Sequence, residues 1–178
     1  MKTLIPLLAS LLIAVRLPAA EVACYGAENV AIPSSTPASD FIINNDGTVT
    51  HRVTGLTWMR CIYGMTWNGV TCEGERALKF WMDALAAGNS LVFAGHNDWR
   101  LPNLKEMLSI LEERCEAPSI NAILFPGNQE HGYWTSTSDN NDGVSNDNAQ
   151  ALIVIDGVVF NQYKGVYGLF RLVRGTAR

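Results

Sequence analysis

The ten-residue tract 139–148 carries the densest group of oxygen-bearing side chains in the sequence. It contains three aspartates and four asparagines, with one glycine, one valine and one serine. Calcium takes about six to eight oxygen ligands, several of them carboxylates or amides on a flexible loop. The competing interpretation is a solvated loop, because Asn and Asp also favour turns and the tract lacks the closing glutamate of an EF-hand. The candidate calcium ligands are Asp139, Asn141, Asp142 and Asp147.

The same tract is also the candidate ligand surface. The flanking segments carry periodic apolar residues that the core requires, whereas 139–148 carries almost none. Long polar loops on a rigid scaffold are where binding contacts are usually made. We expect a ligand to contact the surface formed by residues 133–148, joined by the loop that holds Trp67. The candidate ligand-binding residues are Trp67, Trp134, Asp139, Asn141, Asp142, Asn146 and Asp147.

Trp67 stands apart from the other four tryptophans. It lies between Cys61 and Cys72, where a short closed loop presents an indole to solvent for contact with a sugar. The alternative is that Trp67 packs in the core, which is the common place for a tryptophan and our interpretation of Trp58, Trp81 and Trp99.

Residues that perform catalysis do not form a pattern in this sequence. The three histidines are far apart and lack metal-ligand spacing, and no G-x-S-x-G motif is present. A glycosidase needs two carboxylates at a defined separation, and nothing singles out such a pair. We therefore expect a protein that is not an enzyme and has no cofactor, apart from the calcium alternative.

The charge of the chain argues against polyanionic partners. Thirteen basic and 17 acidic residues give a net charge of −4. Removing Lys2 and Arg16 with an N-terminal signal leaves 11 − 17 = −6. A negative surface is repelled by nucleic acid and anionic lipid, so we expect neither as a partner.

The first 20 residues predict a signal peptide. Lys2 precedes an apolar run over 4–15, and the small residues Ala19 and Ala20 follow. The run is too short to span a bilayer, although an anchor helix and a lipidated Cys24 are the alternatives. We therefore expect an exported protein, periplasmic, cell-surface or secreted, with no transmembrane segment in its mature form. The expected organisation is a signal peptide over 1–20, an extended leader over 21–39 and one domain over 40–178.

The four cysteines predict disulfides, because an even number in an exported chain is typical of bridges. Three connectivities are open. Cys61 and Cys72 enclose a short loop and are the expected local pair, which leaves Cys24 to join Cys115. A zinc site is the competing interpretation, but no C-x-x-C is present.

The expected elements are strands, then two helices, then strands. Asn45-Asp46-Gly47 and Asp156-Gly157 are hairpin turns, because Asp-Gly accepts the positive φ angles that such turns need. Apolar spacing predicts a helix over 75–88, and Asn103 with Glu106 forms a capping box for a second helix that ends near Cys115. The expected strands after the helices are 133–138, 149–155, 158–163 and 168–174. This order predicts an α+β domain with an antiparallel sheet.

Four motifs then resemble a known family. The segments NNDGTVTHRVTGLTWMRC, DWRLPNLKEMLSIL, YWTSTSD and YGLFRLVRG are similar to the Lcl C-terminal domain, also called DUF1566. The resemblance implies an extracellular bacterial binding or adhesion module. WRLPNLKEM and FRLVRG are also similar to the group of C-type-lectin-like and formylglycine-generating-enzyme folds. That likeness implies two helices packed on an antiparallel sheet with long ligand-binding loops.

One departure bears on activity. The formylglycine-generating enzymes use copper-binding cysteines late in the chain, and this sequence has no cysteine after Cys115. We therefore predict a disulfide-stapled, C-type-lectin-like α+β module that binds a glycan or a surface ligand through its loops and does not catalyse. The alternative is a structural or accessory subunit of a surface filament, pilus or envelope complex with protein partners.

Overall fold

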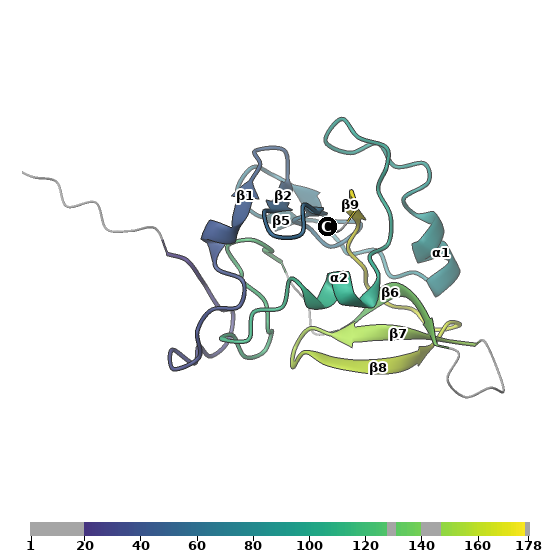
Figure 1. Cartoon of the computed structure of the whole chain (residues 1–178). Helices are drawn as coiled ribbons and strands as arrows, with labels where there is room; N and C mark the ends of the chain where they lie inside the picture. The colour runs from purple at the N-terminus through teal and green to yellow at the C-terminus, as the bar shows by residue number, and fades with distance from the viewer. Residues whose placement is uncertain (1–19, 128–130, 140–146, 177–178) are drawn as a thin grey trace, which may run out of the picture.

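The computed structural model describes residues 20–127, 131–139 and 147–176, and it shows an α+β protein made mostly of strands (Figure 1). Two short α-helices and two disulfides complete it, as the sequence predicts in outline. The elements in chain order are η1 (Ala38–Asp40), β1 (Phe41–Ile43), β2 (Thr48–His51), β3 (Thr57–Met59), β4 (Thr66–Trp67), β5 (Cys72–Glu73), α1 (Trp81–Ala86), α2 (Leu104–Leu108), β6 (Gly132–Asp139), β7 (Asn148–Ile153), β8 (Val158–Tyr163) and β9 (Val173–Arg174).

The N-terminal strands form an antiparallel sheet of order β1-β2-β3-β9. The predicted hairpin turn between β1 and β2 is confirmed, because Gly47 has a φ of 85°. Asp46 Oδ1 accepts hydrogen bonds from the N–H and the hydroxyl of Thr48, which closes the turn. The next two strands in the sequence, β4 and β5, pair with each other and form a separate two-stranded sheet.

The C-terminal strands form a second antiparallel sheet of order β6-β7-β8. The predicted Asp156-Gly157 turn joins β7 to β8, with Gly157 at a φ of 70°. The predicted strand over 168–174 is wrong in length, since β9 comprises only Val173–Arg174. Residues before it instead make isolated bridges, Gly168 with Lys79 and Leu169 with Tyr133.

The first helix is also shorter than the apolar spacing predicts. It covers Trp81–Ala86 in place of 75–88, because the preceding backbone groups bond to distant segments. Ala77 N–H donates to the carbonyl of Tyr63 at 2.9 Å, and Lys79 exchanges two hydrogen bonds with Gly168. In a helix that began at residue 75, the Lys79 N–H would have to bond to the carbonyl of residue 75, so its bond to Gly168 excludes that helix, since each backbone donor is used once.

The second helix begins as predicted and ends early. The Asn103 side chain accepts from the Glu106 N–H at 2.9 Å, and the Glu106 carboxylate accepts from the Asn103 N–H at 2.8 Å. The helix ends at Leu108, not near Cys115. Leu111 pairs with Ile120 in a β-bridge, so the chain leaves the helix to join the core from another direction.

The buried hydrophobic side chains form two clusters. One contains Val49, Trp58, Met107, Tyr133 and Leu152, among others. The other holds Trp81, Trp99, Trp134, Phe170 and Leu172. The core interpretation of Trp58, Trp81 and Trp99 is thus confirmed, because all three are buried, and Trp134 is buried as well.

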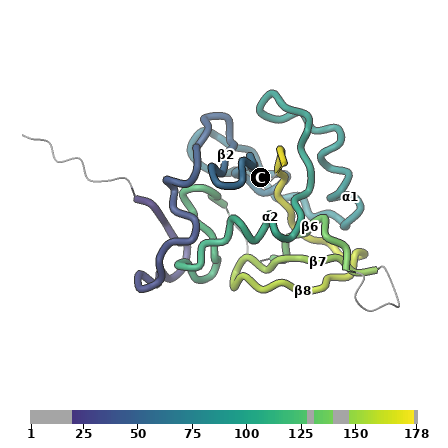
Figure 2. The backbone as a smooth tube through the Cα atoms, viewed as in Figure 1, coloured from purple at the N-terminus to yellow at the C-terminus, as the bar shows by residue number. Residues whose placement is uncertain are grey.

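Both predicted disulfides are present. Cys61 bonds to Cys72, and Cys24 bonds to Cys115 across 91 positions of sequence. The leader lies beside the segment that comes after α2, as Figure 2 shows for the purple part of the tube. Two backbone contacts hold it there: a β-bridge between Glu28 and Cys115, and a hydrogen bond from the Asn29 N–H to the carbonyl of Arg114. In the part of the chain that the structure describes, neither helix is long and apolar enough to cross a membrane.

Candidate functional site

An aromatic cleft of about 480 Å³ opens between the first hairpin, the Cys61–Cys72 loop and the segment after α1. Three rings contribute to its wall: Tyr63 and Trp67 from the Cys61–Cys72 loop, and Phe93 from the segment after α1. We call this set of residues the aromatic cleft. Its lining residues are Asn45, Asp46, Met59, Tyr63, Gly64, Met65, Thr66, Trp67, Leu91 and Phe93.

Trp67 is held in the cleft wall by three constraints. Its strand pairs with Cys72, and the disulfide to Cys61 closes the loop. A Cβ atom on Gly47 would lie 2.8 Å from the Trp67 Cβ, so only glycine allows the hairpin to approach this closely. The Arg60 guanidinium lies 4.2 Å from the centre of the indole ring and stacks on one of its faces.

Arg60 itself is anchored behind the ring. The residue is buried, and its side chain donates to the carbonyls of Leu124 at 3.0 Å and Ile123 at 2.5 Å. Burial lowers the pKa of the Arg60 guanidinium from its ordinary value. The hydrogen bonds and the stacking hold the guanidinium behind the indole, and Arg60 is not among the lining residues of the cleft.

The other two rings are also fixed. Tyr63 stacks on buried Phe170 with ring centres 4.5 Å apart. Phe93 packs edge-on against Trp99 at 5.7 Å, and its backbone exchanges two hydrogen bonds with His96. Ala94 and Gly95 between them both have positive φ angles, as a tight hairpin turn requires.

Polar groups lie at the rim of the cleft. Asn45, Asp46 and Thr66 are exposed and line it. Asp46 carries the one carboxylate among the lining residues, and one of its oxygens is used by Thr48. The arrangement offers three ring surfaces with an amide, a hydroxyl and a carboxylate beside them, which is the composition of a small-ligand site.

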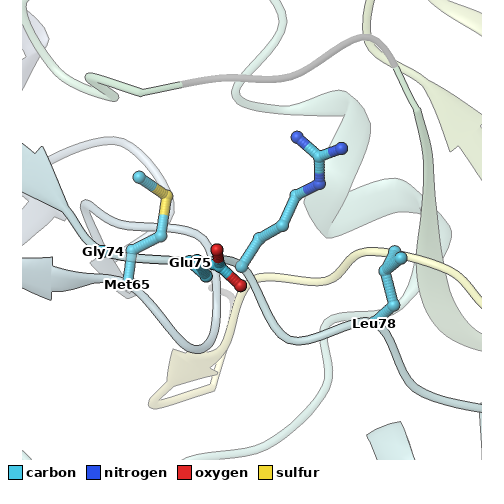
Figure 3. Close-up of a pocket in the computed structure, with 5 residues that line it drawn as sticks. Met65, Gly74, Glu75 and Leu78 are labelled. Atoms are coloured by element: carbon cyan, nitrogen blue, oxygen red, sulfur yellow. The ribbon is translucent and has the colours of Figure 1, made fainter.

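A second cavity of about 430 Å³ shares Met65 as a lining residue with the aromatic cleft (Figure 3). Its remaining lining residues are Gly74, Glu75, Arg76 and Leu78. Figure 3 shows Met65 and Leu78 on opposite sides of it, with Glu75 between them. Because it has no aromatic lining residue, it offers less apolar surface for a ligand than the aromatic cleft.

The structure places the predicted site residues in different environments. Trp67 lines the aromatic cleft, as a ligand-contacting tryptophan must. Trp134 does not belong in the set, because it is fully buried and its indole N–H donates to the carbonyl of Lys79 at 3.0 Å. Asp139, at the end of β6, is only 5% exposed, so its carboxylate is packed and not displayed on a loop.

The remaining predicted residues belong to the 139–148 tract. Asp147 is exposed and its carbonyl accepts from the Lys164 N–H at 2.7 Å. Asn141, Asp142 and Asn146 lie outside the described residues, so the calcium prediction stays a prediction. Within residues 20–127, 131–139 and 147–176, no three His, Cys, Asp or Glu side chains gather in a way that could hold a metal ion. The tract joins β6 to β7, whereas Trp67 belongs to the separate β4–β5 sheet.

Sequence reasoning missed Tyr63 and Phe93. Neither lies in a motif; Tyr63 belongs to the Cys61–Cys72 loop that holds Trp67, and only tertiary contacts bring Phe93 to that loop. One signal was readable: Phe93 directly precedes an Ala-Gly pair, and a glycine beside a small residue marks a tight turn.

The comparisons with known proteins bear on the whole domain. No curated protein matches the sequence. The family model of the Lcl C-terminal domain matches residues 47–174, a range inside the predicted 40–178 domain that contains all three rings of the aromatic cleft. The chain therefore belongs to the Lcl C-terminal domain family.

Proposed function

We propose that this protein is an exported, non-catalytic binding and adhesion module that recognises a glycan or another surface ligand through its loops, on a C-type-lectin-like fold. The observation that carries the proposal is the aromatic cleft, with Tyr63, Trp67 and Phe93 fixed on separate supports. The family membership and the two disulfides support it.

The geometry suits recognition because the contact groups are held before a ligand arrives. Each ring packs against a second residue, so little side-chain freedom is lost on binding. A sugar has one apolar face and a ring of hydroxyls. The rings can cover the apolar face while Asn45, Asp46 and Thr66 bond to hydroxyls at the rim.

The chemistry of the cleft supports the absence of catalysis. Glycoside hydrolysis needs two carboxyl groups on either side of the bond that breaks. Asp46 is the one acid among the lining residues, and its Oδ1 already accepts from Thr48. The cleft thus provides a binding surface without a general acid and base pair.

A structural or accessory subunit with protein partners is the second candidate. The observation that favours it is β8, the outer strand of its sheet, which exposes Val158, Val159 and Tyr163. Outer strands accept extended segments of partner proteins by backbone pairing. Substitution of β8 would then abolish partner binding, whereas substitution in the cleft would not.

A glycan array with the purified oxidised protein tests the proposal. Phe93→Ala removes a cleft ring and should lower binding about tenfold, since a ring contact is worth about 1 kcal/mol or more. Phe80→Ala is the matched control, because Phe80 is partly exposed and stacks on Tyr167 outside the cleft. No glycan binding, or equal loss in both variants, would contradict the proposal.

A further inference from the structure

We infer that the aromatic cleft selects neutral sugars over sulfated, sialylated or other anionic ones. This inference rests on the proposed function and adds the class of ligand to it. The inference is based on the lining of the cleft. Three rings lie beside a single solvent-exposed carboxylate, Asp46, and no lysine or arginine is among the lining residues.

The charges around the cleft disfavour an anion. Sites that bind sulfate or carboxylate place arginine or lysine donors on the ligand. Here the Arg60 guanidinium is buried behind Trp67 and donates to two backbone carbonyls. Asp46 is exposed at the rim and would repel an anionic substituent, and the net charge of −4 acts in the same direction.

The same contacts disfavour a cation. Aromatic rings with a carboxylate can hold a quaternary ammonium group through the ring faces. The Arg60 guanidinium already occupies one face of Trp67, at 4.2 Å. That face is therefore not open to a second cation. A neutral ligand with an apolar face satisfies both constraints.

The neutral ligand must also form hydrogen bonds with the polar groups at the rim of the cleft. Hydroxyl groups both donate and accept, so they can bond to the Asn45 amide, the Asp46 carboxylate and the Thr66 hydroxyl. A purely apolar ligand would leave these groups without partners when it covered them, which costs free energy. The combination of ring faces and rim therefore fits a neutral sugar.

The test compares neutral oligosaccharides with the same oligosaccharides carrying one sulfate or one sialic acid. Binding to the purified oxidised full chain is measured by calorimetry at low and at physiological ionic strength. We expect the anionic derivative of each pair to bind about threefold to tenfold more weakly than the neutral one. The ratio of the two affinities should be closer to one at higher salt.

A matched pair of variants locates the effect. Asp46→Asn removes the charge and keeps the oxygen that accepts from Thr48, so it should raise the affinity for the anionic derivatives and narrow the ratio. Asp156→Asn is the control, because Asp156 occupies the same place in the other Asp-Gly turn and its Oδ1 accepts from Val158. It should leave the ratio as in the wild type.

The outcomes separate the two proposals. Cleft-dependent binding in which anionic sugars bind as tightly as neutral ones, or an unchanged ratio in Asp46→Asn, overturns the neutral-sugar inference alone. Cleft-dependent binding of trimethylammonium compounds without sugar binding overturns it too. If no sugar binds, or if Phe93→Ala binds sugar like the wild type, the proposed function and this inference both fail.

Discussion

Glu112 should be the residue whose loss most weakens the attachment of the leader. Its side chain is fully buried and accepts six hydrogen bonds, five of them from the leader. The donors are Ser34 Oγ at 2.6 Å, the Thr36 N–H at 2.8 Å, Thr36 Oγ1 at 3.0 Å, the Arg114 N–H at 3.0 Å, the Ser35 N–H at 3.1 Å and Ser35 Oγ at 3.5 Å.

The magnitude follows from the donors that lose their partner in Glu112→Ala. Thr36 is 3% exposed, so its N–H and its hydroxyl would be left buried without an acceptor. Each such group costs about 1–3 kcal/mol, and the lost contacts of the side chain add to that. We expect a loss of about 3–5 kcal/mol in the free energy of unfolding, or about 6–20 °C in melting temperature for a chain of this size.

The same carboxylate predicts acid lability. Burial alone raises the pKa of Glu112, but the hydrogen bonds from Ser34, Arg114, Thr36 and Ser35 outweigh it and hold the pKa below its ordinary value. A depressed pKa in the folded state contributes stability above the unfolded pKa, and this stability is lost as the pH falls through the folded pKa. The wild type should therefore lose stability below about pH 4.5, near the unfolded pKa of glutamate.

Denaturant unfolding followed by circular dichroism measures these effects between pH 3 and 7. Glu112→Gln keeps the shape and removes the charge, so it should flatten the acid limb of the profile. Glu113→Ala is the control, because Glu113 is the next residue in the chain and its side chain is exposed. The reasoning is refuted if Glu112→Ala unfolds within about 1 kcal/mol of the wild type, a loss typical of an ordinary substitution.

The remaining predictions concern the staple, the helix cap and calcium. Replacing Cys61 and Cys72 together by Ser should cost about 3 kcal/mol by the chain-entropy estimate for an 11-residue loop, as denaturant unfolding would show. Glu106→Ala removes a capping box and a bidentate ion pair, so unfolding should become about 2 kcal/mol easier, and a loss under about 0.5 kcal/mol would contradict the cap assignment. Calcium should raise the melting temperature of the wild type and not that of an Asp142→Ala, Asp147→Ala variant. Equal curves with and without calcium would reject the metal site.

Local signals in the sequence determined several features without reference to the rest of the chain. Asp-Gly pairs specify hairpin turns, since glycine adopts a positive φ at little cost, and both predicted turns formed. Asn103 and Glu106 are three positions apart, and the capping box needs nothing beyond that spacing. The disulfide partners followed from loop length and an even cysteine count.

Lengths of elements were decided by tertiary structure. Apolar spacing predicted a helix over 75–88, but the backbone at Ala77 and Lys79 bonds to Tyr63 and Gly168. Those bonds join segments many positions apart, and no window of local sequence contains both partners. Helix propensity contributes only a few tenths of a kcal/mol per residue to the free energy, so such contacts override it.

The candidate site was also decided by tertiary structure. Trp134 lies in a polar-looking segment beside the 139–148 tract, yet it is fully buried in the core cluster that contains Trp81 and Phe170. Trp67 was identifiable because the closed loop around it is local. Tyr63 lies in the same loop, whereas Phe93 joins them only when the β1–β2 hairpin, the disulfide loop and the segment after α1 meet. Sequence records which residues can contact a ligand, and packing of distant segments selects the few that share one cleft.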